Sequence, residues 1–280
     1  MIHDPEIAMI CIPDLVDRYL GILEVPREPP SIDGLKKLVQ AHVCHVPFEN
    51  ISKLHYRKHH DLRALPNPDV YLDGLERSRF GGTCYPNNYF FYRLLVSLGY
   101  KARLCGADML NPDVHLVSMV DIDGREYLVD VGYAAPFTEP LPRDLVSDHT
   151  IYLGSDKYVL KPKDSAGRSR LELYRGGQLK HFYVAKPTPR SIEEFETVIA
   201  DSFRDAATFM NAILLARFCT EGATVIHNLT VFRYHGFRMT KRTLADTNAL
   251  SSVINDIFGI PSEISTDVLN DLDRFDDAWT

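Results

Sequence analysis

The sequence predicts an α+β fold in three parts, and three features of the residue pattern predict it. The first hundred residues carry apolar side chains at helical spacing, the middle of the chain consists of short apolar or alternating runs between glycine-containing turns, and the last third mixes both patterns. We therefore expect a helical domain over residues 1–100, an antiparallel sheet able to close as a β-barrel over residues 101–188, and an α/β domain over residues 189–280.

The predicted helices of the first part follow from apolar spacing and from capping residues. Residues 12–23 carry apolar side chains on one face, at a spacing of four: Leu15, Tyr19 and Leu23. Ser31 stands before the next apolar stripe, over residues 32–43, and has the side chain of a helix N-cap. The segment "HVPFEN" breaks the pattern, and a last helix is expected to begin at Pro86 and to stop at Gly99.

The middle part is predicted to be an antiparallel sheet. Its apolar or alternating runs are separated by Asp-Gly, Gly-Ser and Gly-Gly turns, and they begin at residues 102, 114, 125, 150, 169 and 178. The third part has a different order. It is predicted to contain two helices (191–203 and 205–218), a hairpin (224–240), a helix that ends at Gly259, and an acidic helix that fades into a tail (267–280).

The composition disfavours several classes of function. Of the 280 residues 45% are hydrophobic and 25% are charged, as in an ordinary globular chain, and the net charge is −7. A basic groove for nucleic acid is therefore not expected, and the basic stretch "LHYRKHHDLR" is interpreted as a solvated loop. No apolar run reaches about 18 residues. The N-terminus carries acidic residues where a signal peptide is basic, and scattered cysteines indicate reduced thiols, so we expect a cytoplasmic protein with no membrane or nucleic-acid partner.

Cys84 is the candidate nucleophile. It follows Gly81 and Gly82, and it stands two residues before Pro86 at the start of a predicted helix. The unpaired N–H groups of a helix N-terminus carry partial positive charge and favour a thiolate, while two glycines let the chain turn tightly and leave one side open to a substrate. The alternative interpretation of this stretch is a buried structural sulfur at a turn.

A candidate partner for the thiol comes from the hairpin "VHLVSMVDIDGREYLVDVG". If its two-residue turn is Asp123-Gly124, His115 lies opposite Gly132, so that His115 and Asp130 share one face as diagonal neighbours. Such neighbours are roughly 7–8 Å apart at the backbone, a gap that an imidazole and a carboxylate can bridge. A three-residue loop would place one of them on the opposite face.

The chemistry follows from this pairing. Asp130 stands in an otherwise apolar strand and needs a partner to be tolerated there. Asp130 would fix the tautomer of His115 and stabilise its charged form, and His115 would draw the proton from Cys84. The spacing leaves an alternative open, in which His115 and Asp130 form a buried pair that satisfies each other's hydrogen bonds and has no catalytic role.

The remaining histidines and cysteines favour structural roles. His42, Cys44 and His45 have no second cluster at zinc-finger spacing, so we expect a core or boundary role and no metal. His59 and His60 are expected at the surface. Further cysteines stand in apolar runs and are predicted to be buried: Cys11, Cys105 and Cys219. The sequence has no Walker or dinucleotide glycine fingerprint.

Several motifs, taken in order, resemble those of the arylamine N-acetyltransferase family. They are "DRYL" followed by "VPFEN", then "GGTCYPNN", "VHLVSMV" and "YLVDVGY", with "DSFRDAATFMNAILLARF" and "FGI" near the end. The similarity spans essentially the whole chain, and the ordered set is specific although each block alone is not. The resemblance implies a helical domain, a β-barrel and an α/β lid around a cysteine-proteinase-like Cys-His-Asp core.

The resemblance also implies a set of site residues. The family's catalytic residues would be Cys84, His115 and Asp130 in this chain. The wall of the acyl site would include Phe48 and Tyr85, whose backbone N–H would help to hold the oxyanion. The coenzyme would lie near four residues: Gly81, Gly82, Gly132 and Tyr133.

The implied reaction is a ping-pong acetyl transfer. Acetyl coenzyme A, a co-substrate rather than a permanently bound cofactor, would acylate Cys84, and an arylamine, arylhydrazine or arylhydroxylamine would then attack this thioester while His115 handles protons. The resemblance implies a cytoplasmic enzyme of xenobiotic metabolism that is a monomer or weak homodimer. Its partners would be acetyl-CoA and a small aromatic amine.

The chain departs from the family pattern at several positions. Phe80 stands where the family usually has Arg, Pro86 stands where it usually has Glu, and Ala134 and Ala135 replace small turn residues near the coenzyme. The segment between the nucleophile and the histidine is also shorter than usual. Two alternatives therefore stay open: an acyltransferase or amide synthase of the same fold with a different acyl donor, and a catalytically silent homologue. A papain-like or transglutaminase-like hydrolase is less favoured, because no protease-type flank is present.

Overall fold

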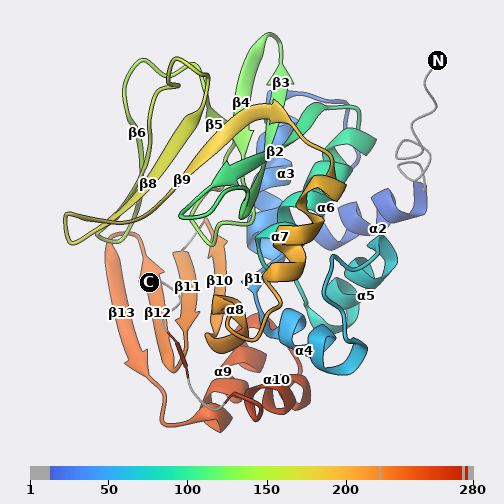
Figure 1. Ribbon diagram of the computed structural model, residues 1–280, viewed down its shortest axis with the longest axis vertical. Coiled ribbons are helices and arrows are strands. Elements are labelled where there is room, and N and C mark those ends of the chain that lie inside the picture. The colour runs from blue at the N-terminus through green and yellow to red at the C-terminus, as the bar shows by residue number, and fades with distance from the viewer. Residues whose placement is uncertain (1–12, 221, 273–274, 277–280) are drawn as a thin grey trace.

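The protein, described by a computed structural model, consists of helices packed against two antiparallel sheets (Figure 1). The structure describes residues 13–220, 222–272 and 275–276. The predictions for Cys11 and for the end of the acidic tail lie outside these ranges. None of the described helices is both long and apolar enough to cross a lipid bilayer.

The first part of the chain is helical, as predicted. Its helices are α2 (Pro13–Leu23), α3 (Ile32–His45), α4 (Ile51–His60), α5 (Pro68–Ser78) and α6 (Cys84–Ser97). Ser31 is the N-cap of α3, and its Oγ accepts a hydrogen bond from the N–H of Gly34 at 3.0 Å. Gly99 follows α6 with φ +90°, a left-handed conformation that glycine adopts without strain.

The predicted loop "LHYRKHHDLR" is wrong, because most of this stretch belongs to α4. The prediction relied on the basic residues and overlooked the apolar first turn of the helix. Ile51 and Leu54 of this turn are buried in one cluster with Ile213 and Leu250 from the far end of the chain. Only the last turn of α4 is exposed, and it holds His59 and His60 at the surface as predicted.

Helix α6 begins two residues earlier than predicted. Thr83 is its N-cap, with extended backbone, and Cys84 is its first residue. Pro86 occupies the third helical position rather than the first. The N–H groups of a first turn have no intrahelical partner, so proline is tolerated there.

The middle part forms an eight-stranded antiparallel sheet. Its strands are β2 (Lys101–Asp108), β3 (His115–Ile122), β4 (Arg125–Val129), β5 (Leu141–Pro142), β6 (His149–Leu153), β7 (Asp156–Leu160), β8 (Ser169–Arg175) and β9 (Gln178–Pro189). The spatial order is β5-β4-β3-β2-β9-β8-β7-β6. The sheet curls as a half-barrel (Figure 1), and among the described residues its edge strands β5 and β6 are not paired with each other.

The register of the hairpin β3–β4 is the predicted one. Ser118 pairs with Val129 and Ile122 pairs with Arg125, so the turn consists of two residues, Asp123-Gly124. Asp123 and Gly124 both have positive φ, at 52° and 77°, as a type I′ turn requires. This turn holds the strand ends that carry the predicted site residues on the intended face.

The last third mixes helices and strands. It contains η1 (Ile192–Phe195), α7 (Glu196–Asp201), α8 (Thr208–Asn211), β10 (Leu214–Cys219), β11 (Gly222–His227), β12 (Thr230–His235), β13 (Arg238–Thr243), α9 (Thr247–Phe258) and α10 (Ser262–Leu269). The second sheet has the order β1-β10-β11-β12-β13, in which β1 (Phe48–Glu49) comes from the helical part. Gly259 caps α9 as predicted, with φ +75°.

The prediction of a helix over residues 205–218 is wrong for the second half of this range. Only α8 is helical there, and the apolar run that follows is strand β10. Leu214 and Leu215 point to opposite sides of the strand and join different hydrophobic clusters, so β10 is covered on both faces. A short continuous apolar run is compatible with a buried helix or a buried strand, and the prediction chose the former.

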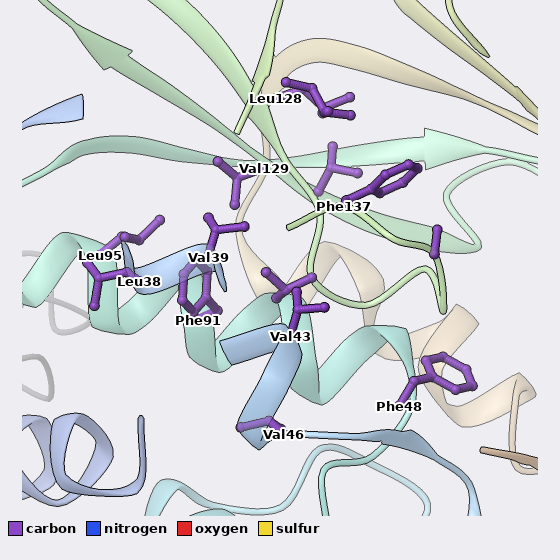
Figure 2. Close-up of a cluster of buried hydrophobic side chains, with 14 of the residues drawn as sticks. Leu38, Val39, Val43, Val46, Phe48, Phe91, Leu95, Leu128, Val129 and Phe137 are labelled. Atoms are coloured by element: carbon purple, nitrogen blue, oxygen red, sulfur yellow. The ribbon is translucent and has the colours of Figure 1, made fainter. Parts of the chain in front are cut away.

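The main core lies between α3, α6 and the eight-stranded sheet. Figure 2 shows side chains of α3 and α6 packed beneath those of β4 and of the loop that follows it; the labelled members include Leu38, Val39, Val43, Phe91, Leu95, Val129 and Phe137. This packing holds the start of α6 against the end of β4. The α+β fold class is confirmed, while the division of the chain at residues 100 and 188 stays a prediction.

Candidate active site

Cys84 stands on a tightly constrained turn. A Cβ on Gly81 would overlap the carbonyl of Pro47, and Gly82 has φ +92°. The buried carboxylate of Glu49 accepts a hydrogen bond from the N–H of Gly82 at 2.7 Å. Close packing at Gly81 and the positive φ of Gly82 explain why glycine is needed at both positions. A role for these glycines in binding the coenzyme stays a prediction.

The structure brings His115 and Asp130 together. His115 Nε2 lies 2.8 Å from Asp130 Oδ2, and both side chains are buried. A Cβ on Gly132 would come within 2.9 Å of the Cα and carbonyl oxygen of Cys84, so the chain after β4 lies directly on the first turn of α6. The hairpin turn and this close approach together place the pair beside Cys84.

The charge state of His115 follows from its neighbours. Burial is the largest single influence and disfavours the imidazolium, but the carboxylate of Asp130 and the side chain of Cys84 outweigh it and raise the pKa of His115 to about 10. Nδ1 of His115 is buried and has no hydrogen-bond partner among the described residues that meets ordinary geometry. Among the described residues, no hydrogen bond of ordinary geometry therefore joins Cys84 to Nδ1 of His115.

Asn88 connects the three elements of the site. Its Nδ2 donates to Asp130 Oδ1 at 2.9 Å and to the carbonyl of Leu116 at 2.7 Å, and its Oδ1 accepts from the N–H of Val131 at 2.9 Å. Asn88 is a site residue that prediction from the sequence missed. A signal was present, because residue i+4 from Cys84 lies on the same face of the helix.

Aromatic side chains surround the imidazole. The ring centroids of Tyr133 and Tyr183 lie 5.6 Å and 5.1 Å from that of His115. The hydroxyl of Tyr133 is 2.5 Å from Nδ1 of His181, another residue that the sequence pattern did not point to. Tyr133, predicted to lie near the coenzyme, is thus placed against His115.

A cavity of about 500 Å³, counting its open mouth, flanks the turn that carries Cys84. Chain neighbours on both sides of the thiol line it, among them Gly82, Thr83 and Tyr85. Cys84 itself packs against the hydrophobic cluster that contains Tyr85 and Phe203, both of which also line the cavity. Tyr85 is buried, with its hydroxyl donating to the carbonyl of Val114 at 3.1 Å.

Phe48 is not among the described residues that line this cavity. It lies in β1 opposite Ala216 of β10, and its ring packs edge-on against Phe209 at 5.6 Å. Its predicted place in the wall of the acyl site stays a prediction.

The competing histidines and cysteines are mostly structural. His42 is fully buried and bonded to the hydroxyl of Tyr19 and to Oδ1 of Asn87, so its core role is confirmed. Cys105 is buried as predicted, but Cys219 is exposed, because it ends β10 at the rim of the second sheet. Within the described ranges, no group of three or more His, Cys, Asp or Glu side chains is arranged to hold a metal ion.

The sequence of the chain is similar to two named acyltransferases and to a synthase. A protein of Salmonella typhimurium with arylamine N-acetyltransferase and N-hydroxyarylamine O-acetyltransferase activities in its name is 24% identical over 249 residues, 84% of each chain. Proansamycin X synthase of Amycolatopsis mediterranei is 32% identical over 119 residues, 40% of this chain and 45% of the synthase. An N-malonyltransferase of Fusarium pseudograminearum is 32% identical over 115 residues, 35% of this chain and 33% of that one. The chain thus spans less than half the length of the last two relatives.

Solved structures share the fold. The arylamine N-acetyltransferase of Salmonella typhimurium has a TM-score of 0.77 at 19% identity, covering 91% of this chain and 98% of that chain. The Mycobacterium marinum arylamine N-acetyltransferase in complex with CoA has a TM-score of 0.75 at 22% identity, covering 90% of this chain and 94% of that chain. A family model for N-acetyltransferases matches residues 31–266, which is most of the sequence. The chain therefore belongs to the arylamine N-acetyltransferase family.

Proposed function

We propose that the protein transfers an acetyl group from acetyl-CoA to an arylamine, arylhydrazine or arylhydroxylamine, by a ping-pong mechanism through a thioester on Cys84. The observation that carries the proposal is that the segment after β4, whose Asp130 lies 2.8 Å from His115 Nε2, rests directly on the first turn of α6 at Cys84. This is the arrangement of nucleophile, base and orienting carboxylate that acyl transfer requires.

The first half-reaction would form the acyl-enzyme. The sulfur of Cys84 attacks the thioester carbonyl, and the negative charge develops on the carbonyl oxygen. The N–H of Tyr85 lies in the first turn of α6, where it has no intrahelical partner, and together with the helix dipole it would stabilise that charge. The carbon–sulfur bond to coenzyme A then breaks, and the imidazolium of His115 donates the proton to the leaving thiolate.

The second half-reaction would regenerate the thiol. The amine attacks the carbonyl of the thioester, His115 accepts the proton that the amine loses, and the sulfur of Cys84 leaves. Asp130 keeps the imidazole oriented through both steps, and Asn88 holds Asp130 from its other oxygen.

Support for the substrates comes from two sources. The Mycobacterium marinum relative was solved with CoA, which fits acetyl-CoA as the donor. The cavity beside the turn is lined by the aromatic side chains of Tyr71, Phe80, Tyr85 and Phe203, which suits a small aromatic acceptor. Coenzyme contacts at Gly81, Gly82, Gly132 and Tyr133, a cytoplasmic location, and a monomeric or weakly dimeric state stay predictions.

A second candidate is an acyltransferase or amide synthase with another acyl donor. It is favoured by the similarity to a proansamycin X synthase and to an N-malonyltransferase, whose names denote products other than acetylated arylamines. The departures at Phe80, Pro86 and Ala134 affect the surroundings of the thiol and fit such a change of substrate.

Mass spectrometry tests the proposal. Acid quenching after incubation with acetyl-CoA should trap one acetyl group on the peptide that contains Cys84, and an aromatic amine should discharge it. Cys84→Ser should fold normally and carry no label, while Cys44→Ser, which alters a half-buried thiol outside the site, should be labelled like the unmodified protein. Rapid alkylation of Cys84 by iodoacetamide without acetyl labelling would favour the second candidate. If the thiol reacts with neither reagent, the protein is a silent homologue.

A further inference from the structure

Lys53 is a buried cation that no carboxylate of the described residues pairs with. It lies in the first turn of α4 and is only 7% exposed. Its Nζ lies 2.6 Å from Oγ of Ser202 and 3.9 Å from the centre of the Phe203 ring. In the part of the chain that the structure describes, no carboxylate forms an ion pair with it, and Ser202 is its one hydrogen-bond partner.

Other buried charged side chains of this protein are compensated. Arg143 pairs with Glu126, and Asp156 pairs with Arg175 at 2.7 Å. The buried carboxylate of Glu49 accepts hydrogen bonds from backbone and hydroxyl donors. Burial of an ammonium group without such a partner is costly, so a retained one indicates a partner that arrives with a ligand.

The surroundings of Lys53 are partly arranged for a positive charge. The hydroxyl of Ser202 donates to the carbonyl of Ile199 at 2.6 Å, which leaves its oxygen lone pairs for the ammonium. The face of the Phe203 ring is negative and favours a cation. Burial lowers the pKa of Lys53 to about 8, with Cys84 opposing the shift, so the group is largely protonated at neutral pH.

The position of Lys53 relates it to the reacting sulfur. Lys53 lines the cavity of about 500 Å³ together with Gly82, Thr83 and Tyr85, which stand on either side of Cys84 in the chain. The N-terminus of α6 opens at the same place and adds positive potential. The rest of the lining is largely apolar, including Leu65 and Phe203. An anion bound in this cavity would meet Lys53 and lie close to the turn that carries Cys84.

We propose that Lys53 selects acyl groups that carry a carboxylate at their far end, such as malonyl or succinyl, and pairs with that carboxylate once the acyl group is on Cys84. This inference rests on the proposed acyl transfer through Cys84. The acyl group is the better match than the acceptor, because Lys53 lines the same cavity as Thr83 and Tyr85, which flank Cys84, the residue to which the acyl group is bonded. The chemistry is unchanged: the sulfur of Cys84 forms the new thioester, the bond to the coenzyme A sulfur breaks, His115 protonates that sulfur, and the far carboxylate stays ionised.

The experiment compares charged and neutral acyl donors of equal length. The rate of Cys84 acylation is measured by quenched mass spectrometry with succinyl-CoA and with butyryl-CoA, whose acyl chain has a methyl group in place of the carboxylate. We expect the succinyl group to be transferred faster. Lys53→Met, which keeps the volume and removes the charge, should slow acylation by succinyl-CoA about 10- to 100-fold, the loss expected for one charge-assisted hydrogen bond. Acylation by butyryl-CoA and acetyl-CoA should change far less.

Two controls separate specificity from structure. Lys53→Arg keeps the charge and should retain part of the preference for succinyl-CoA. Lys163→Met removes an exposed lysine and should leave all rates unchanged. Because the donor comparison in the unmodified protein already tests the preference, the inference does not depend on how well a variant folds.

Several results would contradict the proposed role of Lys53, and they can be told apart. The role of Lys53 would be overturned if succinyl-CoA and butyryl-CoA acylated Cys84 at equal rates. It would also be overturned if Lys53→Met slowed acylation equally with all donors. Either result would leave the proposed function intact. A preference for charge that appears only among acceptors, for aminobenzoate over aniline, would overturn the assignment to the acyl group. Absence of label on Cys84 from every coenzyme A ester would overturn the proposed function and this inference with it.

Discussion

Asn88 Nδ2 donates a hydrogen bond to Asp130 Oδ1 at 2.9 Å, and the other oxygen of the same carboxylate lies 2.8 Å from His115 Nε2. A helix that begins at Cys84 therefore also holds, one turn later, the carboxylate that orients the imidazole. Cys84, the proposed nucleophile, and Asp130, the proposed orienting group, are thus positioned by one rigid element rather than by two independent loops.

This relationship makes Asn88 a positioning residue. Asn88→Ala should reduce kcat/KM for acyl transfer about 10- to 100-fold and cost about 1–3 kcal/mol of the free energy of unfolding, because it removes the acceptor of the buried N–H of Val131 and one of the donors to Asp130 Oδ1. The pH profile of Cys84 acylation should shift as well. Unchanged acylation in a variant that is destabilised would show that Asn88 has a structural role only.

Gly132 should not tolerate a side chain. In Gly132→Ala, the new Cβ would lie 2.9 Å from backbone atoms of Cys84 and 2.7 Å from Asn88 Nδ2, so the end of β4 must move away from α6. We expect loss of Cys84 acylation and a lower midpoint of thermal unfolding. Gly21→Ala is the matched control: Gly21 is in α2 with open space around it, so this change should stabilise the protein by about 0.5–1 kcal/mol. Full acylation in Gly132→Ala would contradict the close approach of the two elements.

The pH dependence of stability should carry the signature of His115. Its pKa rises from 6.5 to about 10 on folding, so the folded state binds the proton that the unfolded state has lost above pH 6.5. The resulting stabilisation is complete below pH 6.5 and is lost as the pH rises toward 10. The free energy of unfolding should thus fall between pH 6.5 and 8 by up to about 1.4 kcal/mol per pH unit.

Lys53 has the opposite effect at higher pH. Its pKa falls from 10.5 to about 8 on folding, so its burial costs stability below pH 8 and this cost is relieved between pH 8 and 10.5. The decline caused by His115 should flatten above pH 8. Chemical denaturation should show that the free energy of unfolding of His115→Gln does not decline from pH 6.5 to 8. For Lys53→Met, the free energy of unfolding should continue to decline above pH 8. An equally steep decline in His115→Gln would assign the titration to other groups.

Ala134 is a strained position. Its φ is +58°, in the left-handed region that residues with a Cβ adopt at a cost, and it follows Tyr133 directly beside the imidazole. Ala134→Gly should raise the free energy of unfolding by up to about 1 kcal/mol, since relief of strain exceeds the added entropy of the unfolded chain. Ala135→Gly, at a buried position with ordinary φ, should instead destabilise the protein. Denaturant titration of both variants distinguishes them.

Local features of the site could be predicted from the sequence. The Asp-Gly turn set the register of β3 and β4, and the alternation of strand faces then placed His115 beside Asp130. The glycines before Cys84 indicated a tight turn at the start of a helix. Such features depend on residues a few positions apart, so they can be inferred without knowledge of the rest of the chain.

Other features depend on partners far along the chain. The apolar run of β10 became a strand because β1, more than 160 residues earlier, pairs with it and because clusters cover both of its faces. Helix α4 formed in a stretch that looks solvated because its first turn is buried by residues such as Ile213. Neither outcome is encoded in local propensity, which these long-range contacts override.

By itself, then, the sequence determined the local geometry of this protein: the caps, the hairpin turn, and the presence of a thiol at a helix start with a histidine and an aspartate on one face of a hairpin. Only the tertiary structure decided that Asn88 joins helix and hairpin, and that Lys53 is buried beside the turn that carries Cys84 with no carboxylate of the described residues paired to it. The physical reason is that turn and strand geometry act over a few residues, whereas burial and the pairing of charges are set by whatever the fold brings into contact.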